Sequence, residues 1–208
     1  DYNIKEYSQS FDKVYIFSYE NEKNFKLPKN CTLIANTLGI HRYLYSILMP
    51  IINYEKITKC DVLRGLQLSG GIPAVIAKIF FGKKFVINFG YDYAKFAKIE
   101  SKPIQSFLYQ IIEGPITQLA DAVIVTSQEI RTELAKKMKG AKIHFIPNGV
   151  DTKLFRKINT RPSQEFTIIF IGRLEKQKNL ESLIRALSYF KNIKALFYGR
   201  GSLKNALS

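Results

Sequence analysis

The chain has 208 residues, of which 46% are hydrophobic, and its 32 basic and 17 acidic side chains give a formal net charge of +15. This composition excludes a disordered chain, and the longest apolar stretches, 47–52 and 72–81, are too short to cross a membrane. Cys31 and Cys60 lack the spacing of metal ligands, and only two histidines accompany them. We therefore predict reduced thiols and no metal site.

Strands and helices alternate along the first 150 residues. Apolar runs predict strands at 14–19, 31–35, 61–67, 84–88, 121–127 and 142–147. Helices are predicted at 41–54, broken by Pro50; at 72–81, ended by Gly82; at 104–120, kinked at Gly114–Pro115; and at 128–139, capped by Ser127 and ended by Gly140. Strands that are apolar throughout and joined by helices indicate an α/β fold with parallel sheets.

The composition changes at 151–165, which we predict to be a linker. A second alternation then begins, with a strand at 166–171, a helix at 180–190, a strand at 194–198 and a helix from Ser202. We therefore expect a doubly wound N-terminal domain over 1–150 and an incomplete C-terminal domain over 166–208. No glycine-rich turn follows the first strand, so we also expect the N-terminal domain to lack its first strand, as in a fragment.

The segment FTIIFIGRLEKQKNL, residues 166–180, carries the strongest chemical signal. A buried strand ends at Gly172, Arg173 and Lys178 follow, and a helix begins near Asn179. Two cations and free backbone N–H groups at one place suit a phosphate group. The alternative is that Arg173 pairs with Glu175 and that Lys178 is an ordinary surface lysine.

Three other places could contact a ligand. Gly199 and Gly201 could let the backbone approach a nucleotide, or could form a tight turn. Ser69, Gly70 and Gly71 could offer N–H groups to an anion or an acceptor hydroxyl, or could simply cap a helix. Asp92 follows a strand and could contact acceptor hydroxyls, although pairing with Lys95 is the slightly favoured alternative.

Several motifs together resemble the family-4 (group 1) retaining glycosyltransferases of the GT-B fold. They are DAVIVTS at 121–127, IPNGVDTKLF at 146–155, FIGRLEKQKNLESLIRAL at 170–187 and LFYGRGSLKNAL at 196–207. The resemblance implies that Arg173 and Lys178 bind the diphosphate of a nucleotide-sugar donor, without a metal or other cofactor. The family's paired catalytic glutamates would lie beyond Ser208, so catalytic residues cannot be assigned. Many members carry a histidine where this chain has Asn88 and Phe89.

The resemblance implies transfer of a sugar to an acceptor hydroxyl with retention, by a cytoplasmic protein that could lie at the membrane surface. The expected partners are a nucleotide-sugar, a glycan or lipid-linked acceptor, and an anionic membrane surface, and no nucleic acid is expected. The open alternatives are an inactive or split fragment, a nucleotide-diphosphate enzyme such as an epimerase, and a basic nucleic-acid-binding protein.

Overall fold

The computed structural model describes residues 2–22, 26–138, 142–157 and 166–206. Every strand pair in this part of the chain is parallel, so the predicted α/β class is confirmed. The chain forms two compact units: Asp1–Asp92 with Tyr109–Pro147, and Tyr93–Leu108 with Asn148–Ser208. Residues 158–165 of the predicted linker lie outside the described residues.

The first unit is built on a four-stranded sheet in the order β3-β4-β5-β6. Its strands are β3 (Val62–Leu66), β4 (Lys84–Phe89), β5 (Ala122–Val125) and β6 (Ile143–Phe145). A separate two-stranded sheet contains β1 (Val14–Phe17) and β2 (Cys31–Ile34). The helices are α1 (Tyr2–Ser10), α2 (Arg42–Ile52), α3 (Tyr54–Thr58), α4 (Gln67–Phe81), α6 (Pro103–Leu119), whose first turns belong to the second unit, and α7 (Gln128–Lys137).

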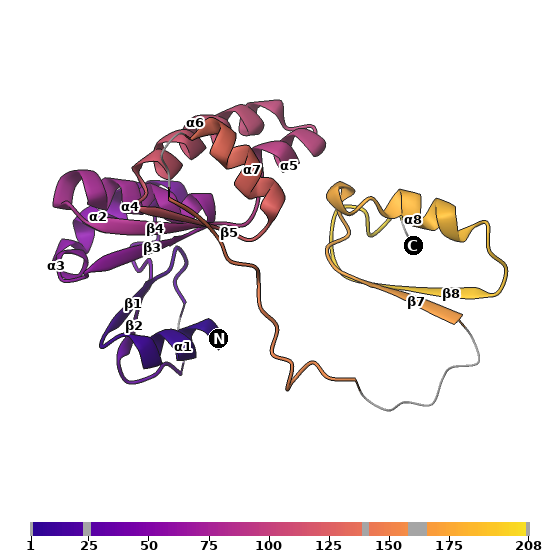
Figure 1. Cartoon of the computed structure of the whole chain (residues 1–208), viewed down its shortest axis with the longest axis horizontal. Helices are drawn as coiled ribbons and strands as arrows, with labels where there is room; N and C mark the ends of the chain where they lie inside the picture. Colours follow the sequence, from indigo (N-terminus) through magenta and orange to yellow (C-terminus); the bar gives the residue numbers. More distant parts are fainter. Residues whose placement is uncertain (1, 23–25, 139–141, 158–165, 207–208) are drawn as a thin grey trace. The chain divides into compact units, whose positions relative to one another are not determined.

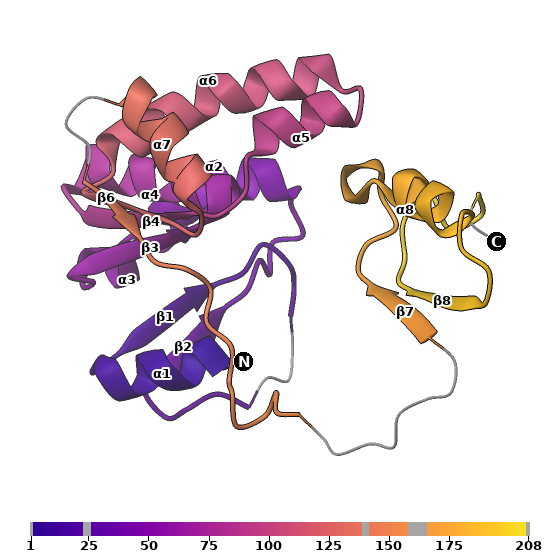
Figure 2. The same cartoon turned by 45° about the vertical axis from the view of Figure 1, so that its right-hand side comes forward.

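The core of the first unit lies between the sheet and the helices on one of its sides. Figures 1 and 2 show α4, α6 and α7 on the same side of β3 to β6. The most deeply buried strand side chains are on the two central strands: Phe85, Ile87, Phe89, Val123 and Val125. Burial of one such side chain stabilises a fold by about 1.5–3 kcal/mol. The central position of β4 and β5 therefore explains why their sequences are apolar nearly throughout.

A second cluster joins the small sheet to the helices. Tyr45 and Met49 of α2, Ile57 of α3 and Ala77 of α4 are buried together, with Phe17 and Tyr19 packed against them. Tyr19 also donates a hydrogen bond from its hydroxyl to the Ser69 carbonyl oxygen, at 2.7 Å. Burial raises the pKa of Tyr19 to about 12. This hydroxyl therefore stays protonated and can keep donating to α4.

Two predicted helix boundaries in the first unit are wrong. Pro50 does not break α2, which continues to Ile52 with Pro50 buried inside it. The helix ends instead at Asn53, whose backbone and side-chain N–H groups both donate to the Met49 carbonyl, each at 3.1 Å. The helix predicted from Ile72 begins at Gln67, which has a left-handed backbone (φ 61°) that turns the chain directly from β3 into α4.

The remaining elements follow the predicted pattern with smaller differences. Gly82 ends α4 in the left-handed conformation, as predicted, and α6 runs without a break through Pro115. Helix α5 (Tyr93–Ile99) was not predicted. Gly140, the predicted end of α7, lies outside the described residues. No helix in the described ranges is both long and apolar enough to span a bilayer.

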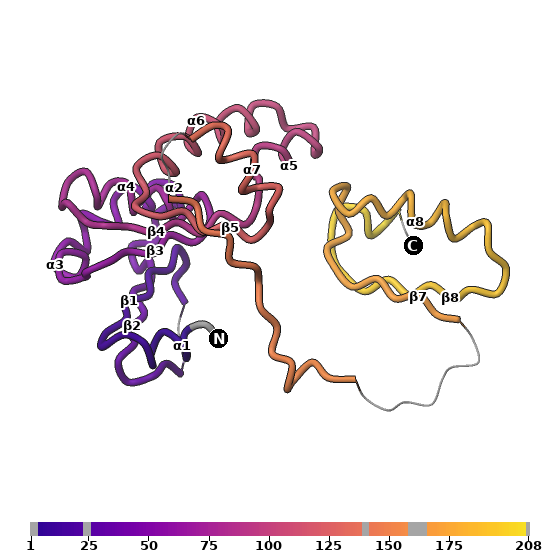
Figure 3. The backbone as a smooth tube through the Cα atoms, viewed as in Figure 1, coloured from indigo at the N-terminus to yellow at the C-terminus, as the bar shows by residue number. Residues whose placement is uncertain are grey.

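The second unit contains one pair of parallel strands beneath a helix (Figure 3). β7 (Phe166–Ile171) and β8 (Ile193–Tyr198) pair along all six residues. Between them the chain forms the short 3-10 helix η1 (Lys176–Lys178) and α8 (Leu180–Leu187). Leu174 and Leu180 are buried, at 5% and 1% exposed, and anchor this connection. After β8, residues 202–206 form turns and not the predicted helix.

Candidate functional site

Arg173 and Lys178 lie on the connection that leaves the carboxyl end of β7. The Gly172 amide donates to the Tyr198 carbonyl at 3.0 Å, and this bond extends the ladder one residue beyond the strand. Both cationic side chains are exposed, Arg173 directly after Gly172 and Lys178 at the end of η1. Asn179 then takes a left-handed backbone (φ 49°), and α8 begins at Leu180. The order strand, glycine, two cations and helix is therefore the order that the sequence predicted.

The nearest carboxylate in this connection is engaged elsewhere. Glu175 accepts hydrogen bonds from the Ser202 hydroxyl at 2.6 Å and from the Ser202 amide at 3.0 Å. These bonds, with the charge of Arg173, hold the pKa of Glu175 below its usual value of 4.5. In the part of the chain that the structure describes, neither Arg173 nor Lys178 forms an ion pair. The alternative pairing of Arg173 with Glu175 is therefore wrong.

Gly199 and Gly201 lie where two backbone segments touch. The Leu174 amide donates to the Arg200 carbonyl at 2.9 Å, and the Leu203 amide donates to the Leu174 carbonyl at 3.0 Å. A Cβ atom on Gly199 would collide with the Gly172 carbonyl oxygen, and one on Gly201 would collide with the Leu174 backbone. Close packing of two turns is thus sufficient to require both glycines.

Ser69, Gly70 and Gly71 do not form the predicted turn before a helix, because α4 has already begun at Gln67. Gly71 is buried, and a Cβ atom there would lie 2.5 Å from Cγ2 of Ile116 on α6. Gly70 is required for packing against Gly65 of β3, 3.2 Å from the position that a Cβ atom would take. The amides of Ser69 and Gly70 still lie in the first turn, where a helix offers free donors.

Asp92 follows the carboxyl end of β4 and lies near a buried carboxylate that sequence reasoning missed. Glu113 of α6 is 6% exposed, and burial raises its pKa above 4.5. The Lys137 ammonium at 3.5 Å opposes this rise, whereas the charge of Asp92 adds to it. The signal that could have found Glu113 is its helical spacing from Ile116 and Thr117, which are both buried.

The aspartates of the DAVIVTS and NGVD motifs have local structural roles. Asp121 of DAVIVTS accepts a hydrogen bond from the Phe85 amide and pairs with Lys78, each at 2.8 Å. Burial would raise the pKa of Asp121, but these two contacts lower it below 3.8. In the NGVD motif, Asp151 accepts from the amides of Lys153 and Leu154, at 2.9 and 3.2 Å, and thereby fixes a turn. The predicted cap of α7 is also confirmed, because Ser127 Oγ accepts from the Ile130 amide.

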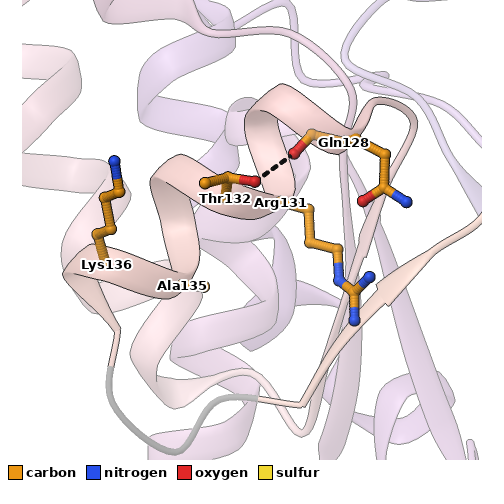
Figure 4. Close-up of a pocket in the computed structure, with 5 residues that line it drawn as sticks. All are labelled: Gln128, Arg131, Thr132, Ala135 and Lys136. Atoms are coloured by element: carbon orange, nitrogen blue, oxygen red, sulfur yellow. Dashed lines mark hydrogen bonds between the residues drawn. The ribbon is translucent and has the colours of Figure 1, made fainter.

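A surface hollow of about 400 Å³ lies along α7 (Figure 4). Its lining residues are Gln128, Arg131, Thr132, Ala135 and Lys136. All five are exposed and come from the same helix. No second element contributes a side chain, so the hollow lacks the convergent polar groups of a ligand site.

Known proteins similar to this chain identify its family and fold. The sequence profile of Glycosyltransferase Family 4 matches residues 13–154. The phosphatidylinositol N-acetylglucosaminyltransferase of Arabidopsis thaliana has one subunit that is 32% identical over 81 residues, which are 38% of this chain and 18% of that protein. The structure of sucrose-phosphate synthase from Thermosynechococcus elongatus superposes with a TM-score of 0.75 at 19% identity, over 89% of this chain and 52% of that one.

The chain thus spans about half of the solved protein and less than a fifth of the plant subunit. The family profile covers more than half of the chain, and its match ends before β7. The parallel α/β architecture is that of the GT-B glycosyltransferases. The chain belongs to Glycosyltransferase Family 4.

Proposed function

We propose that this chain binds the diphosphate of a nucleotide-sugar through Arg173 and Lys178, next to Gly172. The observation that carries the proposal is that both cations are exposed at the carboxyl end of β7 while Glu175, the nearest acidic group, is bound to Ser202. Ligands of open α/β sheets bind at the carboxyl ends of the strands. Two cations placed there can neutralise a diphosphate that gains charge as the sugar departs.

The charge distribution also supports a phosphorylated ligand in the second unit. Residues 166–206 contain eight basic side chains and only two acidic ones, Glu175 and Glu181. We propose that the complete protein transfers the sugar from this donor to an acceptor hydroxyl, with retention and without a metal ion. The acceptor would be a glycan or a lipid, the class to which the phosphatidylinositol in the name of the plant protein belongs. Gly199, Gly201, Ser69, Gly70 and Asp92 remain proposed contacts to nucleotide or acceptor.

We also propose a cytoplasmic protein at a membrane surface. Tyr43, Leu44, Ile47 and Ile51 of α2 are each at least 50% exposed, and their spacing puts them on one side of the helix. Such an apolar face beside Arg42 suits the interface of an anionic bilayer. Co-sedimentation with phosphatidylserine vesicles that Ile47→Asn and Leu44→Asn reduce would support this placement. Equal sedimentation of the variants and the unchanged chain would argue against it.

The donor assignment is tested by calorimetric titration of UDP, GDP and ADP sugars into the chain. Charge-assisted contacts to phosphate contribute about 1.5–3 kcal/mol each, so Arg173→Ala should lower affinity at least ten-fold and Lys178→Ala nearly as much. Arg185→Ala on α8 is a control with the same change in net charge. Unchanged affinity in both test variants would refute the assignment. Salt-sensitive binding to DNA with no affinity for nucleotide-sugars would favour the nucleic-acid alternative.

A further inference from the structure

Arg200 is the one arginine in the turn that follows β8, and its backbone lies beside that of Arg173. The carbonyl of Arg200 accepts a hydrogen bond from the Leu174 amide at 2.9 Å. Two residues earlier on each segment, Gly172 donates to Tyr198 at 3.0 Å. Because β7 and β8 are parallel neighbours, both turns leave the same end of the sheet. The two arginines therefore begin from adjacent, hydrogen-bonded segments.

Contacts on both sides of Arg200 hold this turn in place. Glu175 binds both the amide and the hydroxyl of Ser202, two residues after Arg200. Gly199 and Gly201, on either side of Arg200, pack so closely against the other turn that neither could carry a Cβ atom. A turn fixed by its neighbours presents its central side chain in a restricted region, which lowers the entropy lost when that side chain binds a ligand.

The side chain of Arg200 is exposed and, within the described residues, forms no ion pair. The carboxylate that contacts the turn after β8 is Glu175, and its two strong hydrogen bonds go to Ser202. A guanidinium group keeps its charge at any physiological pH and matches two phosphate oxygens with a planar fork of donors. An exposed arginine beside Arg173 is thus suited to the same anion.

We propose that Arg200 is a third cation of the diphosphate site and binds the same diphosphate as Arg173. This inference rests on the proposed function, because it places Arg200 at the site assigned to Arg173 and Lys178. It adds a contact from the second strand of the unit, so that the diphosphate is bound by the turns after both β7 and β8. Arg200 would bind substrate without taking part in bond breaking.

Inorganic pyrophosphate is the probe, since it carries the shared diphosphate chemistry without a base or a sugar. Its affinity for the whole chain is measured by calorimetry for Arg200→Ala, Arg200→Lys, Arg173→Ala and the control Arg185→Ala. We expect about a ten-fold loss for Arg200→Ala and for Arg173→Ala. Arg200→Lys should lose less, because it keeps the charge and gives up the fork, and Arg185→Ala should change affinity less than two-fold.

The outcomes separate the two proposals. If Arg173→Ala weakens binding while Arg200→Ala behaves like Arg185→Ala, Arg200 lies outside the site and the proposed function stands. If neither Arg173→Ala nor Arg200→Ala weakens binding, the phosphate assignment itself fails. Thermal unfolding of each variant is measured in parallel. A loss of affinity in a fully folded Arg200→Ala variant supports the inference, and a loss that only accompanies unfolding, with Arg200→Lys also unbound, overturns it.

Discussion

Gly199→Ala tests whether the two turns at the carboxyl end of the β7–β8 pair depend on direct backbone contact. A methyl group at this position would collide with the Gly172 carbonyl oxygen, which is a backbone atom and cannot rotate away. Relief requires the turns to separate, which strains the hydrogen bond from the Gly172 amide to Tyr198. Overpacking costs about 1–3 kcal/mol and a weakened hydrogen bond about 1 kcal/mol, so we expect a loss of about 2–4 kcal/mol.

Hydrogen–deuterium exchange measures this loss locally, which suits a chain of two units. The amides of β7 and β8 should exchange at least about 30-fold faster in Gly199→Ala, because a loss of about 2 kcal/mol raises the open population by that factor. Gly149→Ala is the matched control in the same unit, since no atom lies within 4 Å of its added methyl group. If both variants protected β7 and β8 equally, the proposed backbone contact between the turns would be refuted.

Three further predictions concern the first unit. Asp121→Ala should lower the free energy of unfolding by about 2 kcal/mol at pH 7. Because the pKa of Asp121 is lowered, urea unfolding should show this difference shrink as the pH falls below 3.8, and a constant difference would contradict the assignment. Glu113→Gln should stabilise the unit at pH 7 and match the unchanged protein well below pH 4.5, since the raised pKa of Glu113 favours folding only while the carboxyl is protonated; destabilisation at pH 7 would contradict this. Gly71→Ala should cost about 1–3 kcal/mol through its clash with Ile116, whereas Gly114→Ala, with open space around it, should be neutral or stabilising by thermal unfolding.

The predictable part of the fold is the part that local apolar patterns determine. The six-residue strand 166–171 was predicted with its observed ends, and β4 and β5 were predicted nearly so, because burial on both faces makes their sequences continuously apolar. Gly82 and Ser127 mark helix ends through conformation and hydrogen bonding that act within a few residues. Such local signals do not depend on the rest of the fold.

The errors come from tertiary packing that the sequence pattern does not reveal. Pro50 is tolerated in α2 because it lies near the end of the helix and is buried there. The sequence SGG suggests a turn, but packing of Gly70 on β3 and of Gly71 on α6 keeps it helical. At the candidate site, Arg173 and Lys178 were found from the motif. Arg200 and the contact between Glu175 and Ser202 were missed because they depend on the pairing of β7 with β8.

The central claim is that the donor diphosphate binds the connection after β7. The most direct measurement is the change in backbone amide chemical shifts of the ¹⁵N-labelled chain during titration with nucleotide-diphosphate sugars. We predict the largest changes at Gly172, Arg173 and the amides that open α8, and their disappearance in Arg173→Ala. Saturable binding that shifts only amides of the first unit, and leaves those after β7 unmoved, would contradict the claim.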